Sequence, residues 1–132
     1  MSHVTILDAS VLIAAMNPAD AHHGQALALI RREAITGTLI AHGLTIAESA
    51  VGAAAGGRLS QLRKAYDSIG IEVVPTDDDE PWRLAQLRAT TRLPMPDCCV
   101  LDAAQSTGGH LATFDQRLAT AARDHDVPLA MA

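Results

Sequence analysis

The chain has 132 residues, a length that fits one domain and leaves little room for two. It is 48% hydrophobic and 19% charged, which is typical of a folded protein with an aliphatic core and excludes a disordered chain. The formal net charge of −5 argues against a protein that coats nucleic acid by bulk electrostatics, although not against a nuclease. Neither a run of roughly 20 apolar residues nor a signal peptide is visible, so we expect a cytoplasmic protein.

Short apolar runs alternate with helical segments along the chain. The first half is predicted to contain a strand at 3–7, a short helix at 11–15, a helix at 20–34 capped by Asp20, a strand at 38–41, and helices at 44–55 and 59–68. The second half continues with a strand at 71–74, a helix at about 77–91, a helix at 97–106, a strand at 110–114, a helix at 115–124 and a short edge strand at 127–130. This alternation predicts right-handed βαβ units in one three-layer α/β/α domain over residues 1–132, with a mostly parallel central sheet.

Four acids stand where such a fold would bring them together. Asp8 and Asp115 each end an apolar strand, and the ligand crevice of a parallel sheet lies beyond the carboxyl ends of its strands. Asp97 opens a helix, and Glu48 stands among apolar neighbours that suggest an inward orientation. Carboxylates crowded at one point repel each other unless a cation holds them, and Mg²⁺ or Mn²⁺ prefers such ligands. The four acids therefore predict a metal site, and an all-carboxylate metal site indicates phosphate chemistry.

Each of these acids also has a simpler explanation. Asp8, Asp97 and Asp115 all stand where a helix begins, and Asp is a favoured N-cap, so capping explains each one alone but not the set. Ser10 and Thr113 lie two residues from a strand-end acid, where they either hold a carboxylate or a metal-bound water, or satisfy local backbone groups. Asp102 either extends the site, supports it from behind or faces solvent, and we favour the last two.

Other residues of the sequence give less indication of function. The acidic run from Asp77 to Glu80 is predicted to be a solvated helix start. Cys98 and Cys99 are predicted to be two buried thiols, since neighbouring cysteines rarely pair and no zinc-type spacing surrounds them. Six of the ten basic residues fall between Arg58 and Arg92, and they either form a rim around the acidic centre or solvate helix faces. The phosphate loop GxxxxGK[ST], the GxGxxG fingerprint and the GxSxG elbow are all absent from the sequence.

Four short motifs in this order resemble a PIN domain over nearly the whole chain. They are Asp8-Ala9-Ser10-Val11-Leu12-Ile13, a helical Glu48, Pro96-Asp97 followed by Val100-Leu101-Asp102-Ala103-Ala104, and Leu111-Ala112-Thr113-Phe114-Asp115. The length and the order of elements are similar to VapC-type toxins of bacterial toxin–antitoxin pairs. Some relatives carry a further acid shortly after the fourth one, whereas Gln116, Arg117 and Leu118 follow Asp115 here.

The resemblance implies a divalent-metal ribonuclease with a parallel-sheet α/β fold. Asp8, Glu48, Asp97 and Asp115 match the acidic positions that hold Mg²⁺ or Mn²⁺ and carry catalysis, and Ser10 and Thr113 match the polar positions beside them. The resemblance also implies a homodimer, a transfer or ribosomal RNA substrate, and a small antitoxin that blocks the active site.

Several alternatives stay open at this point. The chain is either this ribonuclease or a non-catalytic regulatory module that binds a metal or a peptide in the same crevice. A metal-dependent phosphatase or a DNA nuclease is a third interpretation. Arg88, Arg92 and Arg117 are weak candidates for holding the RNA backbone. The small-residue segment 51–57 predicts a close helix–helix contact, either within the fold or across a dimer.

Overall fold

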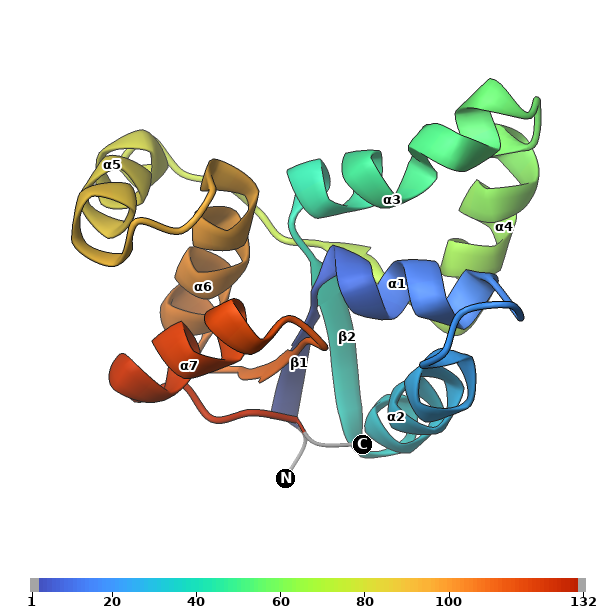
Figure 1. The fold of residues 1–132 in the computed structure, drawn as a ribbon, viewed down its shortest axis with the longest axis horizontal. Coiled ribbons are helices and arrows are strands. Elements are labelled where there is room, and N and C mark those ends of the chain that lie inside the picture. Colours follow the sequence, from blue (N-terminus) through green and yellow to red (C-terminus); the bar gives the residue numbers. More distant parts are fainter. Residues whose placement is uncertain (1–2, 131–132) are drawn as a thin grey trace.

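The protein folds around a four-stranded sheet, seen in a computed structural model that describes residues 3–130. The strands lie in the order β3-β2-β1-β4, and each neighbouring pair is parallel. Their bounds are β1 His3–Leu7, β2 Gly37–Ala41, β3 Glu72–Val73 and β4 His110–Ala112. Helices cover both faces of the sheet (Figure 1), so the predicted three-layer α/β/α fold is confirmed.

The helices form two groups on opposite sides of the sheet (Figure 1). On one side lie α1 (Ala9–Met16), α2 (His23–Thr36) and α4 (Leu59–Ile69). On the other lie α5 (Glu80–Thr91), α6 (Met95–Thr107) and α7 (Gln116–Asp124). Helix α3 (Gly43–Ala55) contacts α1 and α4 on the first side and α6 on the second. None of the helices in the described part of the chain is long and apolar enough to cross a membrane.

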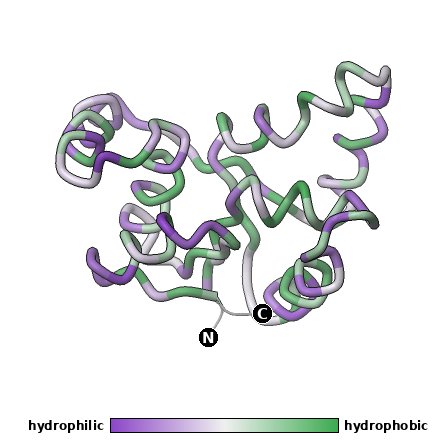
Figure 2. Tube along the Cα trace, viewed as in Figure 1, coloured by the Kyte–Doolittle hydropathy of each residue, from purple (hydrophilic) through white to green (hydrophobic). Residues whose placement is uncertain are grey.

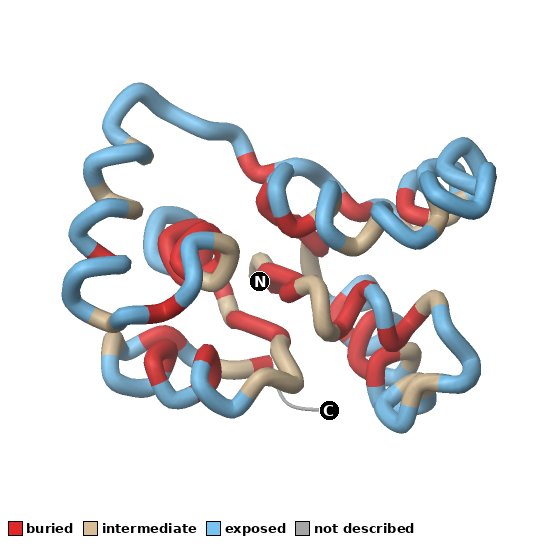
Figure 3. Tube along the Cα trace, turned by 45° about the horizontal axis from the view of Figure 1, so that its top comes forward, coloured by how far each residue is buried: buried red, intermediate tan, exposed pale blue. Residues whose placement is uncertain are grey.

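Alternation along the strands divides the core in two, because successive strand residues point to opposite faces. Ile6 packs with Leu101 on the α6 side, whereas Leu7 packs with Leu12 and Leu29 on the side of α1 and α2. Figure 2 shows continuous hydrophobic colour along α1 and mixed colour along α2, as expected for an inner helix and an outer amphipathic one. Burial follows the same arrangement in Figure 3, where much of α3, α4 and α5 is exposed.

The predicted helices and the first four predicted strands are found, but several boundaries move. Strand β4 ends at Ala112, two residues early, because the next amides bond to side chains: Phe114 N donates to Ser10 Oγ, and Asp115 N donates to Thr113 Oγ1. Strand β3 has only two residues, and the predicted edge strand at 127–130 is reduced to one bridge between Leu111 and Leu129.

Two predicted helix starts also differ. Helix α2 begins at His23 rather than at residue 20, because the Asp20 carboxylate accepts a hydrogen bond from the His22 amide in a preceding turn. Helix α6 begins at Met95, so Asp97 lies within its first turn instead of opening it. Both cysteines of α6 are buried free thiols, as predicted, and burial raises the pKa of Cys99 to about 11.

Candidate active site

The carboxylate of Asp8 is buried between the ends of β1 and β4. Asp8 occupies the N-cap position of α1, but its side chain makes no capping hydrogen bond. Its Oδ2 instead accepts hydrogen bonds from Ser10 Oγ at 2.8 Å and from Thr113 Oγ1 at 2.7 Å. None of the described residues donates a hydrogen bond to Oδ1, so this oxygen is available to a ligand. Capping therefore does not account for Asp8.

Ser10 and Thr113 serve both purposes considered from the sequence. Each hydroxyl donates to Asp8 and accepts from a backbone amide: Ser10 from Phe114 N at 3.1 Å, and Thr113 from Asp115 N at 3.0 Å. The two side chains thus join the loop after β1 to the loop after β4. Because each hydroxyl has one proton, donation to Asp8 fixes how both hydroxyls are oriented.

Asp115 is a true N-cap. Its Oδ1 accepts hydrogen bonds from the amides of Arg117 at 2.9 Å and Leu118 at 3.4 Å, at the start of α7. Capping uses only one carboxylate oxygen, and no described residue donates a hydrogen bond to Oδ2. Asp115 can therefore cap its helix and present an oxygen to the crevice at the same time.

Asp97 is half-buried in the first turn of α6, where Pro94 is the N-cap, so it does not cap the helix either. Its pKa is raised from 3.8 to about 6 by burial and by repulsion from Asp8, Asp115 and Glu48, in that order. Arg117 acts in the opposite direction and lowers this pKa. The four predicted acids therefore lie close enough together for three of them to destabilise the charge on the fourth.

Glu48 is exposed on α3, so the expectation that it faces inward is wrong. The apolar neighbours that suggested burial are themselves largely exposed, and Thr45 is the only fully buried residue among the described residues of α3. The start of α3 faces the start of α6 in Figure 1, and Glu48 contributes to the raised pKa of Asp97. Its carboxylate is therefore part of the acidic group, at the solvent side.

We call Asp8, Glu48, Asp97 and Asp115 the acidic cluster. Its donors are carboxylate oxygens, and the described residues leave at least one oxygen of Asp8 and one of Asp115 without a hydrogen bond. Repulsion from the other three acids contributes to the raised pKa of Asp97, and Arg117 opposes it. Hard divalent cations such as Mg²⁺ or Mn²⁺ fit this donor set, because they prefer oxygen ligands and neutralise crowded carboxylates.

The three candidate arginines have different surroundings. Arg117, at the start of α7, attracts the Asp97 carboxylate. Arg88 acts electrostatically on the Cys98 thiol, and Arg92 ends α5 in a left-handed conformation with φ of 61°. A groove between the end of α5 and α7 is lined by Thr90, Thr91, Gln116, Arg117 and Thr120 among others.

Asp102 does not belong to the acidic cluster, and it does not face solvent. It is buried and bound by Arg83, with Nε at 2.8 Å from Oδ1 and Nη2 at 3.1 Å from Oδ2. Five residues of α-helix turn a side chain by about 140° beyond a full turn, so Asp102 points toward α5 rather than the crevice beside Asp97. Arg83 also binds Asp77 through two hydrogen bonds, so this acid of the predicted solvated run is paired.

Two residues near the cluster were not singled out in the sequence. His42 Nδ1 accepts a hydrogen bond from Leu44 N at the start of α3, and its Nε2 lies 3.1 Å from Glu80 Oε1 at the start of α5. Because Nδ1 is an acceptor, Nε2 carries the proton and donates to Glu80. This pair joins α5 to the helix that carries Glu48. Thr45, on that helix, is buried, and its hydroxyl has no partner among the described residues.

Comparison with known proteins identifies the family and supports the fold. The PIN domain family matches residues 5–124, which include all four acids. VapBC2 from Rickettsia felis, solved bound to a DNA fragment from their promoter, is 16% identical over 96% of each chain, with a TM-score of 0.69. PAE2754 from Pyrobaculum aerophilum is 23% identical over 89% of this chain and 84% of that one, with a TM-score of 0.59. At these identities the two structures show the fold alone, and no curated protein compared with the sequence matches it. The family match over most of the chain shows that this protein belongs to the PIN domain family.

Proposed function

We propose that this protein is a divalent-metal-dependent endoribonuclease that acts as the toxin of a toxin–antitoxin pair. The proposal is supported chiefly by the repulsion that Asp8, Asp115 and Glu48 exert on Asp97, which together with burial raises the pKa of Asp97. Membership of the PIN family supports a nuclease, and the likeness to the toxin–antitoxin complex VapBC2 supports the toxin role. We place the activity in the cytoplasm, where transfer and ribosomal RNA are available as substrates.

In this proposal the acidic cluster holds Mg²⁺ or Mn²⁺. When bound, the cation would supply charge neutralisation at the scissile phosphate and activation of the attacking water. Asp8 is the most firmly held of the proposed ligands, because Ser10 and Thr113 both donate to its Oδ2 and leave Oδ1 without a donor among the described residues. Asp115 is similarly fixed by its capping bonds. Glu48, being exposed, adapts most easily to an incoming substrate.

Arg117 is proposed to hold the RNA backbone beside the cluster. It is the arginine whose charge reaches Asp97, and it lines the groove between α5 and α7. A phosphate in this groove would approach the acidic cluster while its charge is offset by the guanidinium. Arg88 and Arg92, near the end of α5, are proposed to make weaker contacts with the RNA backbone, farther along the RNA strand.

A groove between α1, α3 and α4 is proposed to receive the antitoxin. Its lining combines apolar residues such as Ile13, Met16 and Leu62 with polar ones such as Arg58 and Gln61. The segment 51–57 is exposed apart from the half-buried Ala53, so it is not buried within the described fold (Figure 3). Exposed apolar surface of this kind favours a protein partner. The homodimer implied by the family resemblance remains a separate proposal, which sedimentation of the purified protein tests.

RNA cleavage tests the catalytic proposal. Purified wild-type protein, Asp8→Asn and the matched control Asp78→Asn, an exposed acid outside the cluster, are each incubated with transfer RNA or ribosomal RNA and Mg²⁺. We expect cleavage by wild type and the control, loss of cleavage in EDTA, and loss in Asp8→Asn. Failure of the wild type to cut RNA, with or without EDTA, would favour the regulatory module that binds a metal or a peptide, and cleavage of DNA or a small phosphoester instead would favour the third interpretation.

A further inference from the structure

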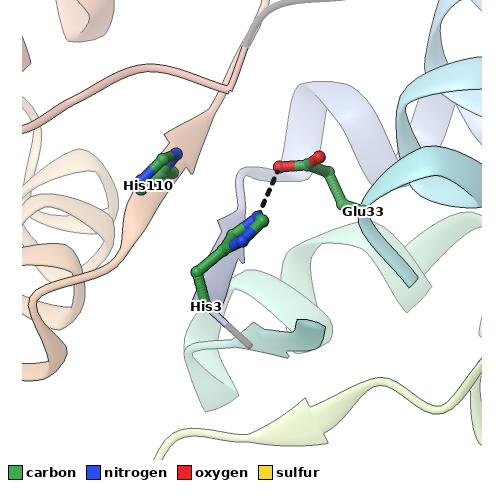
Figure 4. A group of neighbouring side chains, drawn as sticks. All are labelled: His3, Glu33 and His110. Atoms are coloured by element: carbon green, nitrogen blue, oxygen red, sulfur yellow. Dashed lines mark hydrogen bonds and ion pairs between the residues drawn. The ribbon is translucent and has the colours of Figure 1, made fainter. Parts of the chain in front are cut away.

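A second group of potential metal ligands lies at the opposite end of the sheet from the acidic cluster. His3 begins β1, His110 begins β4, and Glu33 extends from α2 toward them (Figure 4). One ligand atom from each residue lies within 4.8 Å of the other two. We propose that His3, Glu33 and His110 form a Zn²⁺ site, which clamps the amino ends of two strands to a helix.

Strand geometry explains why these side chains share one face of the sheet. His3, Thr5 and Leu7 alternate to the face covered by α1 and α2, where Leu7 packs. Thr5 is paired with His110 in the register of β1 and β4, and paired residues of neighbouring strands point to the same face. Glu33 is a buried residue of α2, the helix on that face.

Two glycines fix the backbone beside the histidines. Gly37 lies opposite His3 in the register of β1 and β2, and a Cβ there would come within 2.9 Å of several His3 backbone atoms. Gly109 precedes His110, and a Cβ there would come within 2.8 Å of the Val4 carbonyl oxygen. Both contacts are closer than any other residue tolerates. The two histidine backbones are therefore held by close packing.

The carboxylate of Glu33 is prepared as an anionic ligand. Its side chain is only 8% exposed, and its Oε1 accepts a hydrogen bond from Thr5 Oγ1 at 3.0 Å and lies 3.2 Å from His3 Nε2. Arg32 Nε lies 3.2 Å from Oε2. Outer contacts such as those of Thr5 and Arg32 are what orients ligands at metal sites.

The two imidazoles stack, with ring centroids 4.9 Å apart and an interplanar angle of 23°. A neutral imidazole has a free lone pair, the form that binds metal. Two nitrogens and one carboxylate oxygen match zinc, whereas Mg²⁺ and Ca²⁺ prefer oxygen alone.

The distances define the rearrangement that binding requires. Ligand atoms of a tetrahedral zinc site lie about 3.3 Å apart, given metal–ligand bonds of about 2.0 Å. His3 Nε2 and Glu33 Oε1, at 3.2 Å, already have this spacing. His110 is half-buried, and the proposal requires its side chain to rotate out of the stack so that a ring nitrogen takes the third position. A fourth position stays open for water.

This site is independent of the proposed nuclease function. Five residues of strand separate His3 from Asp8, or about 16 Å at the rise of a β-strand. Zinc at the amino ends of β1 and β4 would raise thermal stability by binding the folded state alone. It would leave Mg²⁺-dependent cleavage at the carboxyl ends unchanged.

Co²⁺ replacing Zn²⁺ distinguishes the two metal sites, because tetrahedral Co²⁺ with nitrogen ligands absorbs visible light strongly and octahedral Co²⁺ with oxygen ligands weakly. The full chain is freed of metal with EDTA, dialysed, and titrated with Co²⁺ and Zn²⁺, with the unfolding temperature followed in parallel. The variants are His110→Ala, His110→Cys, Thr5→Val, Asp8→Asn, and the control His22→Gln at an exposed histidine outside the group.

We expect wild type, Asp8→Asn and His22→Gln to bind one equivalent of Zn²⁺, with strong Co²⁺ absorption and a higher unfolding temperature. His110→Ala should lose all three signals, His110→Cys should restore them, and Thr5→Val should weaken binding about 10- to 100-fold. Unfolding of each variant in EDTA verifies that it folds. Absence of these signals in wild type, or their persistence in His110→Ala, would overturn the proposal and leave His3 and Glu33 as a simple ion pair.

Discussion

The hydroxyl of Thr113 donates a 2.7 Å hydrogen bond to Oδ2 of Asp8, across 105 residues of sequence. This contact joins the carboxyl ends of β1 and β4, the two neighbouring strands whose ends carry Asp8 and Asp115. Together with Ser10, it occupies Oδ2 of Asp8 and leaves Oδ1 without a donor among the described residues. In the proposed metal site, the orientation of the Asp8 carboxylate is therefore set by side chains that are not themselves proposed as ligands.

Replacing Thr113 should weaken catalysis without unfolding the protein. Thr113→Val keeps the shape but removes the donor to Asp8, and loss of such a supporting contact typically costs about 10- to 100-fold in metal affinity or activity. Thr113→Ser keeps the hydroxyl and should retain most activity. The measurement is the RNA cleavage rate as a function of Mg²⁺ concentration. Equal rates for the valine and serine variants would show that Thr113 does not position Asp8.

The raised pKa of Asp97 makes the stability of the metal-free protein depend on pH. Below about pH 4 the carboxyl group is protonated in the folded and unfolded states alike, so it imposes no charge repulsion. Between its ordinary value of 3.8 and its folded value of about 6, the unfolded chain releases the proton first, and stability falls as pH rises. Asp97→Asn should therefore raise the unfolding temperature in EDTA more at pH 8 than at pH 5.

The control for this experiment is Asp78→Asn, at an exposed acid outside the cluster. Mg²⁺ should stabilise the wild type at pH 8 and have a smaller effect on Asp97→Asn, because the cation removes the same repulsion. A difference between Asp97→Asn and wild type that stays constant from pH 5 to pH 8 would contradict the assignment of this pKa.

Arg117 should contribute more to substrate binding than Arg88 or Arg92. Arg117→Glu places a negative charge beside the acidic cluster and is expected to raise KM for RNA about tenfold, equivalent to about 1.4 kcal/mol. Arg92→Glu should raise KM less, because Arg92 lies at the end of α5 and is not among the charged groups that shift the pKa of Asp97. Initial rates over a range of RNA concentrations give both values. A larger increase in KM for Arg92→Glu than for Arg117→Glu would indicate that the RNA backbone does not pass beside α7.

The Arg83 bridge predicts a stability effect that is separate from catalysis. Arg83→Met leaves Asp102 buried without its partner, which should destabilise the fold. Asp77→Asn removes only the exposed half of the bridge and should destabilise the fold less. Urea unfolding of both variants tests this. Equal destabilisation by the two substitutions would mean that the contact of Arg83 with buried Asp102 contributes no more to stability than its contact with Asp77.

Much of the fold follows from the sequence because the apolar runs and their breakers are strong signals. Strand ends at Asp8 and near Asp115 follow from the alternation of elements, and Gly70 and Gly108 end α4 and α6 in left-handed conformations as helix stops do. The sequence does not reveal that hydrogen bonds of the Ser10 and Thr113 hydroxyls end β4 early, because the contacts between these two loops join residues more than 100 positions apart.

The candidate site, like the fold, can be predicted from the sequence only in part. Residue type and order predict the four acids, but the orientation of Glu48 depends on how α3 packs, and most of its apolar residues remain exposed. Helical periodicity alone would have placed Asp102 away from Asp97, whereas its partner Arg83 comes from a different helix. The group of His3, Glu33 and His110 has no sequence spacing that indicates it, since strand register brings it together.

The central claim is that the acidic cluster holds a divalent cation, and anomalous diffraction from crystals soaked in Mn²⁺ tests it most directly. We predict an anomalous peak within bonding distance of Oδ1 of Asp8 and of carboxylate oxygens of Asp97 and Asp115, and no such peak in crystals of Asp8→Asn. A wild-type crystal with Mn²⁺ at saturating concentration and no peak among these carboxylates would contradict the account.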